Sequence, residues 1–163
     1  MNLWLPIGIL ALTTAFGMYW RSQQGKLKTP AVEGNRISNE EISKIIRHKS
    51  SFMVNSDLLD QHQIQLGKNV TLLQFSSAFC SPCKATAHVI SQIVQGMDDV
   101  VYIQVASEEN LKLVEKFDIK STPTVIFFNR DGLEVGRAVG IPTKEQVIIS
   151  INAVRTPSDD VGL

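Results

Sequence analysis

The chain has 163 residues, 44% of them hydrophobic, and its 16 lysines and arginines balance its 16 aspartates and glutamates. This length suffices for one domain with a hydrophobic core and a short appendage. The even charge lacks the basic excess typical of nucleic-acid binders, so we expect no nucleic-acid partner.

An apolar stretch without charge, residues 3–20, opens the chain. It is at the short end of the roughly 17–25 residues that span a bilayer. Trp4, Tyr19 and Trp20 lie at its two ends, where aromatic side chains favour the headgroup region. These features predict a transmembrane anchor over residues 1–21 of a single-pass membrane protein. The alternatives are a buried helix and a cleaved signal peptide, although the start carries no basic residue.

Basic residues follow the predicted anchor, namely Arg21, Lys26 and Lys28. By the positive-inside rule they keep the domain behind them in the cytoplasm, and placement outside the cytoplasm is the alternative. Residues 22–36 are polar and contain glycines and a proline, which predicts a linker.

The domain is predicted to begin at residue 37. Ser38 and Glu41 have the spacing of a capping box, which predicts a helix through about residue 49. Residues 52–54 favour a short strand, and a second helix is expected from there through about residue 65.

From residue 70 onward, β-prone apolar runs alternate with amphipathic helical patterns. Strands are predicted over residues 70–77, 100–106, 124–128 and 133–139, and helices over about 80–97, 108–117 and 143–155. The first two strands should pair in parallel through a helical crossover, and the last two should form a hairpin around a turn at 129–132. The pattern predicts an α/β domain over residues 37–156, with a loose polar tail over 157–163.

The two cysteines of the chain, Cys80 and Cys83, lie three residues apart where a predicted strand gives way to a helix. Backbone N–H groups at a helix start favour negative charge and lower the pKa of a thiol. We expect Cys80 to be exposed and Cys83, on the apolar helical stripe, to be shielded. Cys80 would then attack a client disulfide, and Cys83 would resolve the mixed disulfide. Pro82 suits the first helical turn.

A metal site is the weaker alternative for this cysteine pair. Structural zinc normally needs four Cys or His ligands, and His48, His62 and His88 are not at ligand-like spacings. We therefore expect no metal and no cofactor besides the redox-active disulfide. A purely structural bridge closing so short a loop would add little stability.

Three segments of the chain, LLQFSSAFCSPCK, DIKSTPTVIFF and DGLEVGRAVG, resemble the thioredoxin superfamily. The resemblance implies a thioredoxin-like α/β fold, in which helices flank a central mixed sheet and the cysteines open a helix. It also implies that Pro123 follows a cis peptide bond and lies against the cysteines. The residues that it implies for substrate binding are Phe79, Ser81, Pro82, Thr122, Pro123 and Gly140.

This sequence departs from the family at two positions beneath the cysteines. The family's buried aspartate aligns with Gln74, and its lysine neighbour aligns with Gln104. Glutamine cannot ionise, so we predict slow attack by Cys83 near neutral pH, which Gln74→Asp should accelerate. The simpler alternative is that these supporting residues, Gln74 and Gln104, form a buried hydrogen-bonded pair that serves the structure.

The predicted function is thiol–disulfide exchange with protein dithiol or disulfide clients at a membrane surface, with an unidentified electron donor or acceptor. The alternatives are a client-binding module and a dedicated partner of one membrane redox pathway, both with slow turnover. The direction of the chemistry depends on the reduction potential, which the sequence does not fix.

Overall fold

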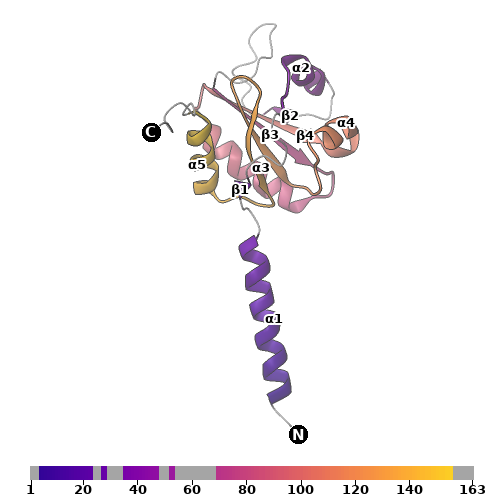
Figure 1. The fold of residues 1–163 in the computed structure, drawn as a ribbon, viewed down its shortest axis with the longest axis vertical. Helices are drawn as coiled ribbons and strands as arrows, with labels where there is room; N and C mark the ends of the chain where they lie inside the picture. The colour runs from indigo at the N-terminus through magenta and orange to yellow at the C-terminus, as the bar shows by residue number, and fades with distance from the viewer. Residues whose placement is uncertain (1–3, 24–26, 29–34, 48–51, 54–68, 156–163) are drawn as a thin grey trace.

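In the computed structural model, residues 4–23, 27–28, 35–47, 52–53 and 69–155 are described (Figure 1). The helices are α1 (Trp4–Gln23), α2 (Asn39–Arg47), α3 (Ser81–Val94), α4 (Leu111–Lys116) and α5 (Lys144–Arg155), and a 3-10 turn, η2 (Ser107–Glu109), precedes α4. The strands are β1 (Leu27–Lys28), β2 (Phe52–Met53), β3 (Val70–Ser76), β4 (Val100–Ala106), β5 (Thr124–Asn129) and β6 (Glu134–Val139).

The strands form one mixed sheet in the order β1-β6-β5-β3-β4-β2. Strands β3 and β4 pair in parallel through the α3 crossover, whereas the other neighbouring strands pair antiparallel. The predicted mixed sheet is confirmed. Strand β1 adds an edge strand inside the segment predicted as a linker, because Leu27 and Lys28 pair with Ala138 and Arg137 of β6.

Helices cover both faces of the sheet, and each face has its own apolar core. One core joins β3 and β4 to α3 and α5 through residues such as Leu72, Ile90 and Ile151. The other joins the opposite face to α2 and α4 through residues such as Ile42 and Phe117. This division follows from the strand pattern, since alternate side chains of a strand point to opposite faces.

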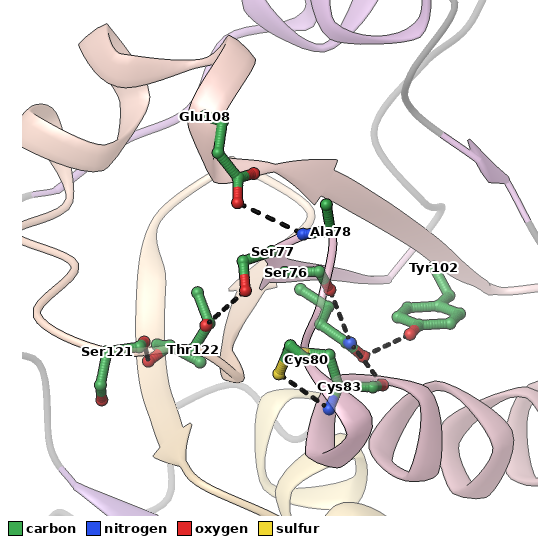
Figure 2. Close-up of a disulfide and its surroundings, with 11 residues drawn as sticks. Ser76, Ser77, Ala78, Cys80, Cys83, Tyr102, Glu108, Ser121 and Thr122 are labelled. Carbon is green, nitrogen blue, oxygen red and sulfur yellow. Dashed lines mark hydrogen bonds between the residues drawn. A yellow bond between two sulfur atoms is a disulfide. The ribbon is translucent and has the colours of Figure 1, made fainter.

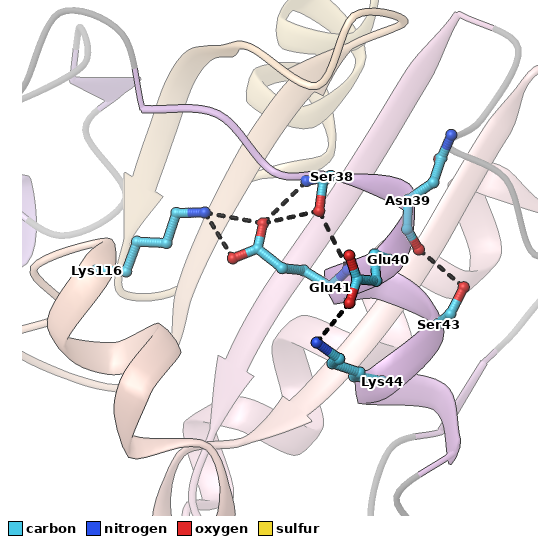
Figure 3. Close-up of polar contacts among 7 residues, drawn as sticks. All are labelled: Ser38, Asn39, Glu40, Glu41, Ser43, Lys44 and Lys116. Atoms are coloured by element: carbon cyan, nitrogen blue, oxygen red, sulfur yellow. Dashed lines mark hydrogen bonds and ion pairs between the residues drawn. The ribbon is translucent and has the colours of Figure 1, made fainter.

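Helix α2 begins at the predicted capping box (Figure 3). The Glu41 backbone N–H donates to Ser38 Oγ over 3.2 Å, and the Ser38 N–H donates to Glu41 Oε2 over 3.0 Å. The same carboxylate accepts from Lys116 Nζ of α4 at 2.6 Å. Glu41 therefore caps the start of α2 and also links this helix to α4 on the same face of the sheet.

The hairpin and last helix also begin as predicted. Asn129 Oδ1 accepts from the N–H groups of Asp131 and Leu133, each over 3.0 Å, and so closes the turn between β5 and β6. Gly132 takes a positive φ of 74° there, which glycine adopts without steric cost. Before α5, the Thr143 N–H donates to Gln146 Oε1 over 2.8 Å, as a capping box requires.

The helix predicted over residues 108–117 begins later in the structure. Glu108 and Glu109 were expected to open a helix, but they lie in η2, and α4 begins only at Leu111. Leu111 is 67% exposed, and α4 packs on the core through Leu113 and Val114. The helix predicted between residues 55 and 65 lies outside the described residues.

The predicted transmembrane anchor is wrong. Residues 4–23 do form a helix, α1, but no helix in the described part of the chain is long and apolar enough to cross a membrane. Residues 3–20 carry no charge, but α1 is not apolar enough to span a bilayer. The single-pass topology is wrong for the same reason, and the cytoplasmic placement loses its basis because the positive-inside rule applies only beside a span. Membrane contact through residues 3–20 stays a prediction.

Candidate active site

Cys80 and Cys83 form a disulfide at the start of α3, with a Cα–Cα distance of 5.2 Å (Figure 2). Strand β3 ends at Ser76, and a short loop carries the chain to Cys80, the N-cap residue of α3. The Cys83 backbone N–H donates to Cys80 Sγ over 3.1 Å. A negative charge on this sulfur would therefore lie at a helix start, where free N–H groups stabilise it.

Cys80 is more exposed than Cys83, as predicted, but the difference between them is small. Cys80 is 9% exposed and Cys83 is 3% exposed. Cys80 is less exposed than expected because its sulfur is bonded to Cys83 and lies over the first turn of α3. The residues around it are open to solvent: Phe79 is 101% exposed, and Ser81 and Pro82 are also exposed.

The loop before β5 lies beside the cysteine loop. The Thr122–Pro123 peptide bond is cis, as the resemblance implies. Thr122 Oγ1 donates to Ser77 Oγ over 3.4 Å, which joins this loop to the segment that leads to Cys80 (Figure 2). Pro123 is buried, while Thr122 is half-buried. These contacts bring the predicted residues of the two loops together.

Gly140 at the end of β6 completes this side of the site. Its backbone N–H donates to the Pro123 carbonyl over 2.9 Å, and its φ is 85°. Glycine is favoured at such a φ because other residues meet steric strain there. Gly140 therefore holds the Pro123 loop by its backbone.

Beneath the cysteines, Gln74 has partners that differ from the predicted one. Its Nε2 donates to the Cys83 carbonyl over 3.0 Å and to Ser76 Oγ over 2.9 Å, and its Oε1 accepts from the Tyr102 hydroxyl at 2.5 Å. Gln104 is the neighbour of Gln74 in the strand register, but the side-chain hydrogen bonds of Gln74 go elsewhere. The predicted glutamine pair is therefore wrong.

Tyr102 was not among the predicted site residues. It is fully buried, and this burial raises the pKa of its hydroxyl. A buried tyrosine hydroxyl usually finds a hydrogen-bond partner, so a tyrosine two residues before Gln104 in a buried strand was the available signal. Glu108 was also missed as a site residue: its Oε1 accepts from the Ala78 N–H over 3.3 Å beside the cysteine loop.

The arrangement is a dithiol–disulfide site on a thioredoxin-like α/β fold. Among the described residues, no group of three or more His, Cys, Asp or Glu side chains could hold a metal ion. The sulfur atoms of Cys80 and Cys83 can exchange electrons by forming and breaking disulfide bonds.

Comparison with known proteins agrees with this class. The family model described as thioredoxin matches residues 52–153, and the chain therefore belongs to the thioredoxin family. It is 30% identical over 87 residues to a thioredoxin of Chlamydia pneumoniae, which covers 53% of this chain and 84% of that protein. It is 34% identical over 74 residues to thioredoxin H5 of Oryza sativa subsp. japonica, covering 45% of this chain but only 53% of that relative.

A solved structure has the same fold. Thioredoxin NaTrxh from Nicotiana alata superposes with a TM-score of 0.50 at 25% identity, over 55% of this chain and 76% of that one. Family membership and the cysteine pair together identify a thiol–disulfide oxidoreductase.

Proposed function

We propose that the chain exchanges disulfides with protein clients through Cys80 as the attacking residue and Cys83 as the resolving residue. The observation that carries this proposal is the position of the disulfide at the start of α3, with Cys80 the more exposed of the two sulfurs. The oxidoreductase unit is taken to be residues 37–156, and it requires no cofactor besides this disulfide.

The reaction balances without any further redox group. In the reduced protein, the Cys80 thiolate attacks one sulfur of a client disulfide, and the second client sulfur leaves as a thiolate that takes up a proton. The Cys83 thiol then loses its proton and attacks Cys80 Sγ, which releases the first client sulfur as a second thiolate. Two electrons pass from the protein dithiol to the client, and the reverse sequence oxidises a client dithiol.

The client is expected to bind across the surface formed by Phe79, Ser81, Pro82, Thr122, Pro123 and Gly140. Exposed Phe79 offers apolar contact on one side of the disulfide. On the other side, the loop of Thr122 and Pro123 is tied to Ser77 and Gly140, so it presents a fixed backbone to an extended client segment.

Mass spectrometry of trapped complexes tests the two cysteine roles. The full chain carrying Cys83→Ser should accumulate a mixed disulfide with a disulfide-bonded client protein, because attack by Cys80 proceeds and resolution cannot. Cys80→Ser should accumulate none, and the wild-type chain should release reduced client. Equal trapping by both variants would refute the assignment of roles.

A second candidate function is a client-binding module that turns over slowly. Gln74 favours it, since this amide beside Cys83 cannot accept a proton as a carboxylate does. Turnover with a client disulfide and excess dithiol separates the two functions: repeated cycles support the oxidoreductase, and a single stoichiometric capture supports the binding module. Equilibration with glutathione then gives the direction, because about −270 mV marks a reductant and about −120 mV an oxidant.

A further inference from the structure

A chain of neutral hydrogen bonds connects strand β4 to the resolving cysteine. It runs from the Tyr102 hydroxyl to Gln74 Oε1, and from Gln74 Nε2 to the Cys83 carbonyl, with Ser76 Oγ as a side branch (Figure 2). Gln74 and Tyr102 are fully buried, and Cys83 is nearly so. Water therefore does not compete for these bonds.

The direction of this chain is fixed by chemistry. The Cys83 carbonyl can only accept a hydrogen bond, so the Gln74 amide must turn its NH₂ group toward it. Gln74 Oε1 then faces the tyrosine hydroxyl, and Tyr102 must donate. Rotating the amide by half a turn would place Gln74 Oε1 against the Cys83 carbonyl, and two acceptors cannot share a hydrogen bond. The carbonyl therefore fixes the amide orientation, and the Tyr102 hydroxyl supplies the donor that the buried Gln74 Oε1 needs.

Apart from Glu108, whose carboxylate accepts from the Ala78 N–H beside the cysteine loop, the surroundings contain few groups that could titrate near Cys83. Tyr102 is the only ionisable residue in β3, β4 and β5, the strands closest to the site. On α3 itself, Lys84 and His88 are exposed, and on α5, which packs against α3, Lys144 and Glu145 are exposed. The remaining charged residue of α5, Arg155, binds Asp99 at the far end of that helix.

We propose that Tyr102 and Gln74 are positioning residues for the resolving step, which hold the backbone of Cys83 through hydrogen bonds that involve no charged group. The proposal rests on the exchange reaction proposed above. In that reaction the Cys83 thiol gives its proton to solvent or to the departing client thiolate, and the protein contributes position alone. The pH dependence of the resolution rate should therefore show a single ionisation, that of the Cys83 thiol.

The experiment uses the reduced full-length chain and the aromatic disulfide dithio-bis-nitrobenzoate. Attack by Cys80 releases one coloured nitrobenzoate thiolate, and resolution by Cys83 releases the second, so both steps are recorded in one absorbance trace. Cys83→Ser isolates the first step. Stopped-flow traces between about pH 5 and 9 cover the range below and above an ordinary thiol pKa.

Tyr102→Phe keeps the ring and removes the donor to Gln74. We expect resolution about three- to tenfold slower at every pH, as the loss of one hydrogen bond predicts, with the shape of the pH profile unchanged. The effect on attack by Cys80 should be smaller. Ile151→Val is the stability control, because it removes a methyl group from the core that also contains Tyr102 and leaves the Tyr102–Gln74–Cys83 hydrogen bonds intact. It should not change the ratio of the two rates.

Gln74→Glu adds an ionisable group of nearly the same shape and should introduce a second ionisation into the resolution profile. The proposal is overturned if Tyr102→Phe changes the ratio of the two rates no more than Ile151→Val does, or if the wild-type profile already contains a second ionisation. Absence of the first release in wild type would instead refute the proposed function itself. The two failures are thus distinguishable.

Discussion

A buried ion pair on β6 provides a sharp test of the fold. Arg137 Nε lies 2.6 Å from Glu134 Oε1, and Arg137 Nη2 donates to Glu134 Oε2 over 2.7 Å. The glutamate side chain is 0% exposed and the arginine side chain 7% exposed. Arg137 Nη1 also donates over 2.9 Å to the carbonyl of Phe117, the C-cap residue of α4. Carbonyl groups at the end of a helix lack an intrahelical partner, and Arg137 supplies one here.

Glu134→Gln keeps the size of the side chain and removes its charge, which leaves the Arg137 cation buried without a counter-ion. Breaking one side of a buried pair costs about 3–5 kcal/mol, a large share of the roughly 5–15 kcal/mol by which a domain is stable. Replacing both residues by methionine removes both charges. It then leaves chiefly the Phe117 carbonyl unpaired, at about 1–3 kcal/mol.

Urea unfolding of wild type, Glu134→Gln and the double methionine variant measures these differences. With a slope of about 1–3 kcal/mol per molar urea, the single variant should unfold at least about 1 M earlier than wild type. The double variant should fall between the two. A loss below about 1 kcal/mol in Glu134→Gln, or a double variant no more stable than the single one, would refute this account of the pair.

Three further stability predictions follow from single contacts. The Arg155 hydrogen bonds hold the pKa of Asp99 below its usual value, so Asp99→Asn should lower the free energy of urea unfolding by about 0.5–1 kcal/mol at neutral pH. The difference from wild type should fade as the pH drops through the lowered native pKa, and a difference independent of pH would contradict this. Phe117→Ala should lower the free energy of unfolding by about 3–5 kcal/mol, because the Phe117 ring packs against two other rings in the core. Phe79→Ala, at an exposed position, should change it by less than about 0.5 kcal/mol, and similar losses in the two variants would be inconsistent with this packing. Ser38→Ala should cost about 1 kcal/mol by thermal unfolding through loss of the α2 cap, and no loss would show that the cap is dispensable.

Most of the sheet could be predicted from the sequence because its strands are continuous apolar runs bounded by strong local signals. Asn129 and Gly132 mark the hairpin turn, and Thr143 with Gln146 marks the start of α5. Each of these signals depends on neighbours within four residues, so no knowledge of the tertiary structure is needed to recognise it.

Edge pairing and side-chain partners could not be predicted in this way. Two residues, Leu27 and Lys28, are too short a segment for any periodicity, and they become a strand only because β6 offers a free edge. The hydrogen-bond partners of Gln74 depend on which atoms of α3 lie against the sheet. Strand register alone points to Gln104, whereas the crossover brings the Cys83 carbonyl instead.

The two glutamines where the resemblance implies aspartate and lysine are best understood together. A carboxylate at the position of Gln74 would be fully buried, and such a charge is costly unless a counter-ion accompanies it. Strands β3, β4 and β5 supply no cation, since Gln104 stands at the position of the family's lysine. A neutral amide avoids that cost and can still donate to the Cys83 carbonyl, with Tyr102 completing its hydrogen bonds. The site therefore keeps the Cys83 backbone in place and gives up a buried proton acceptor.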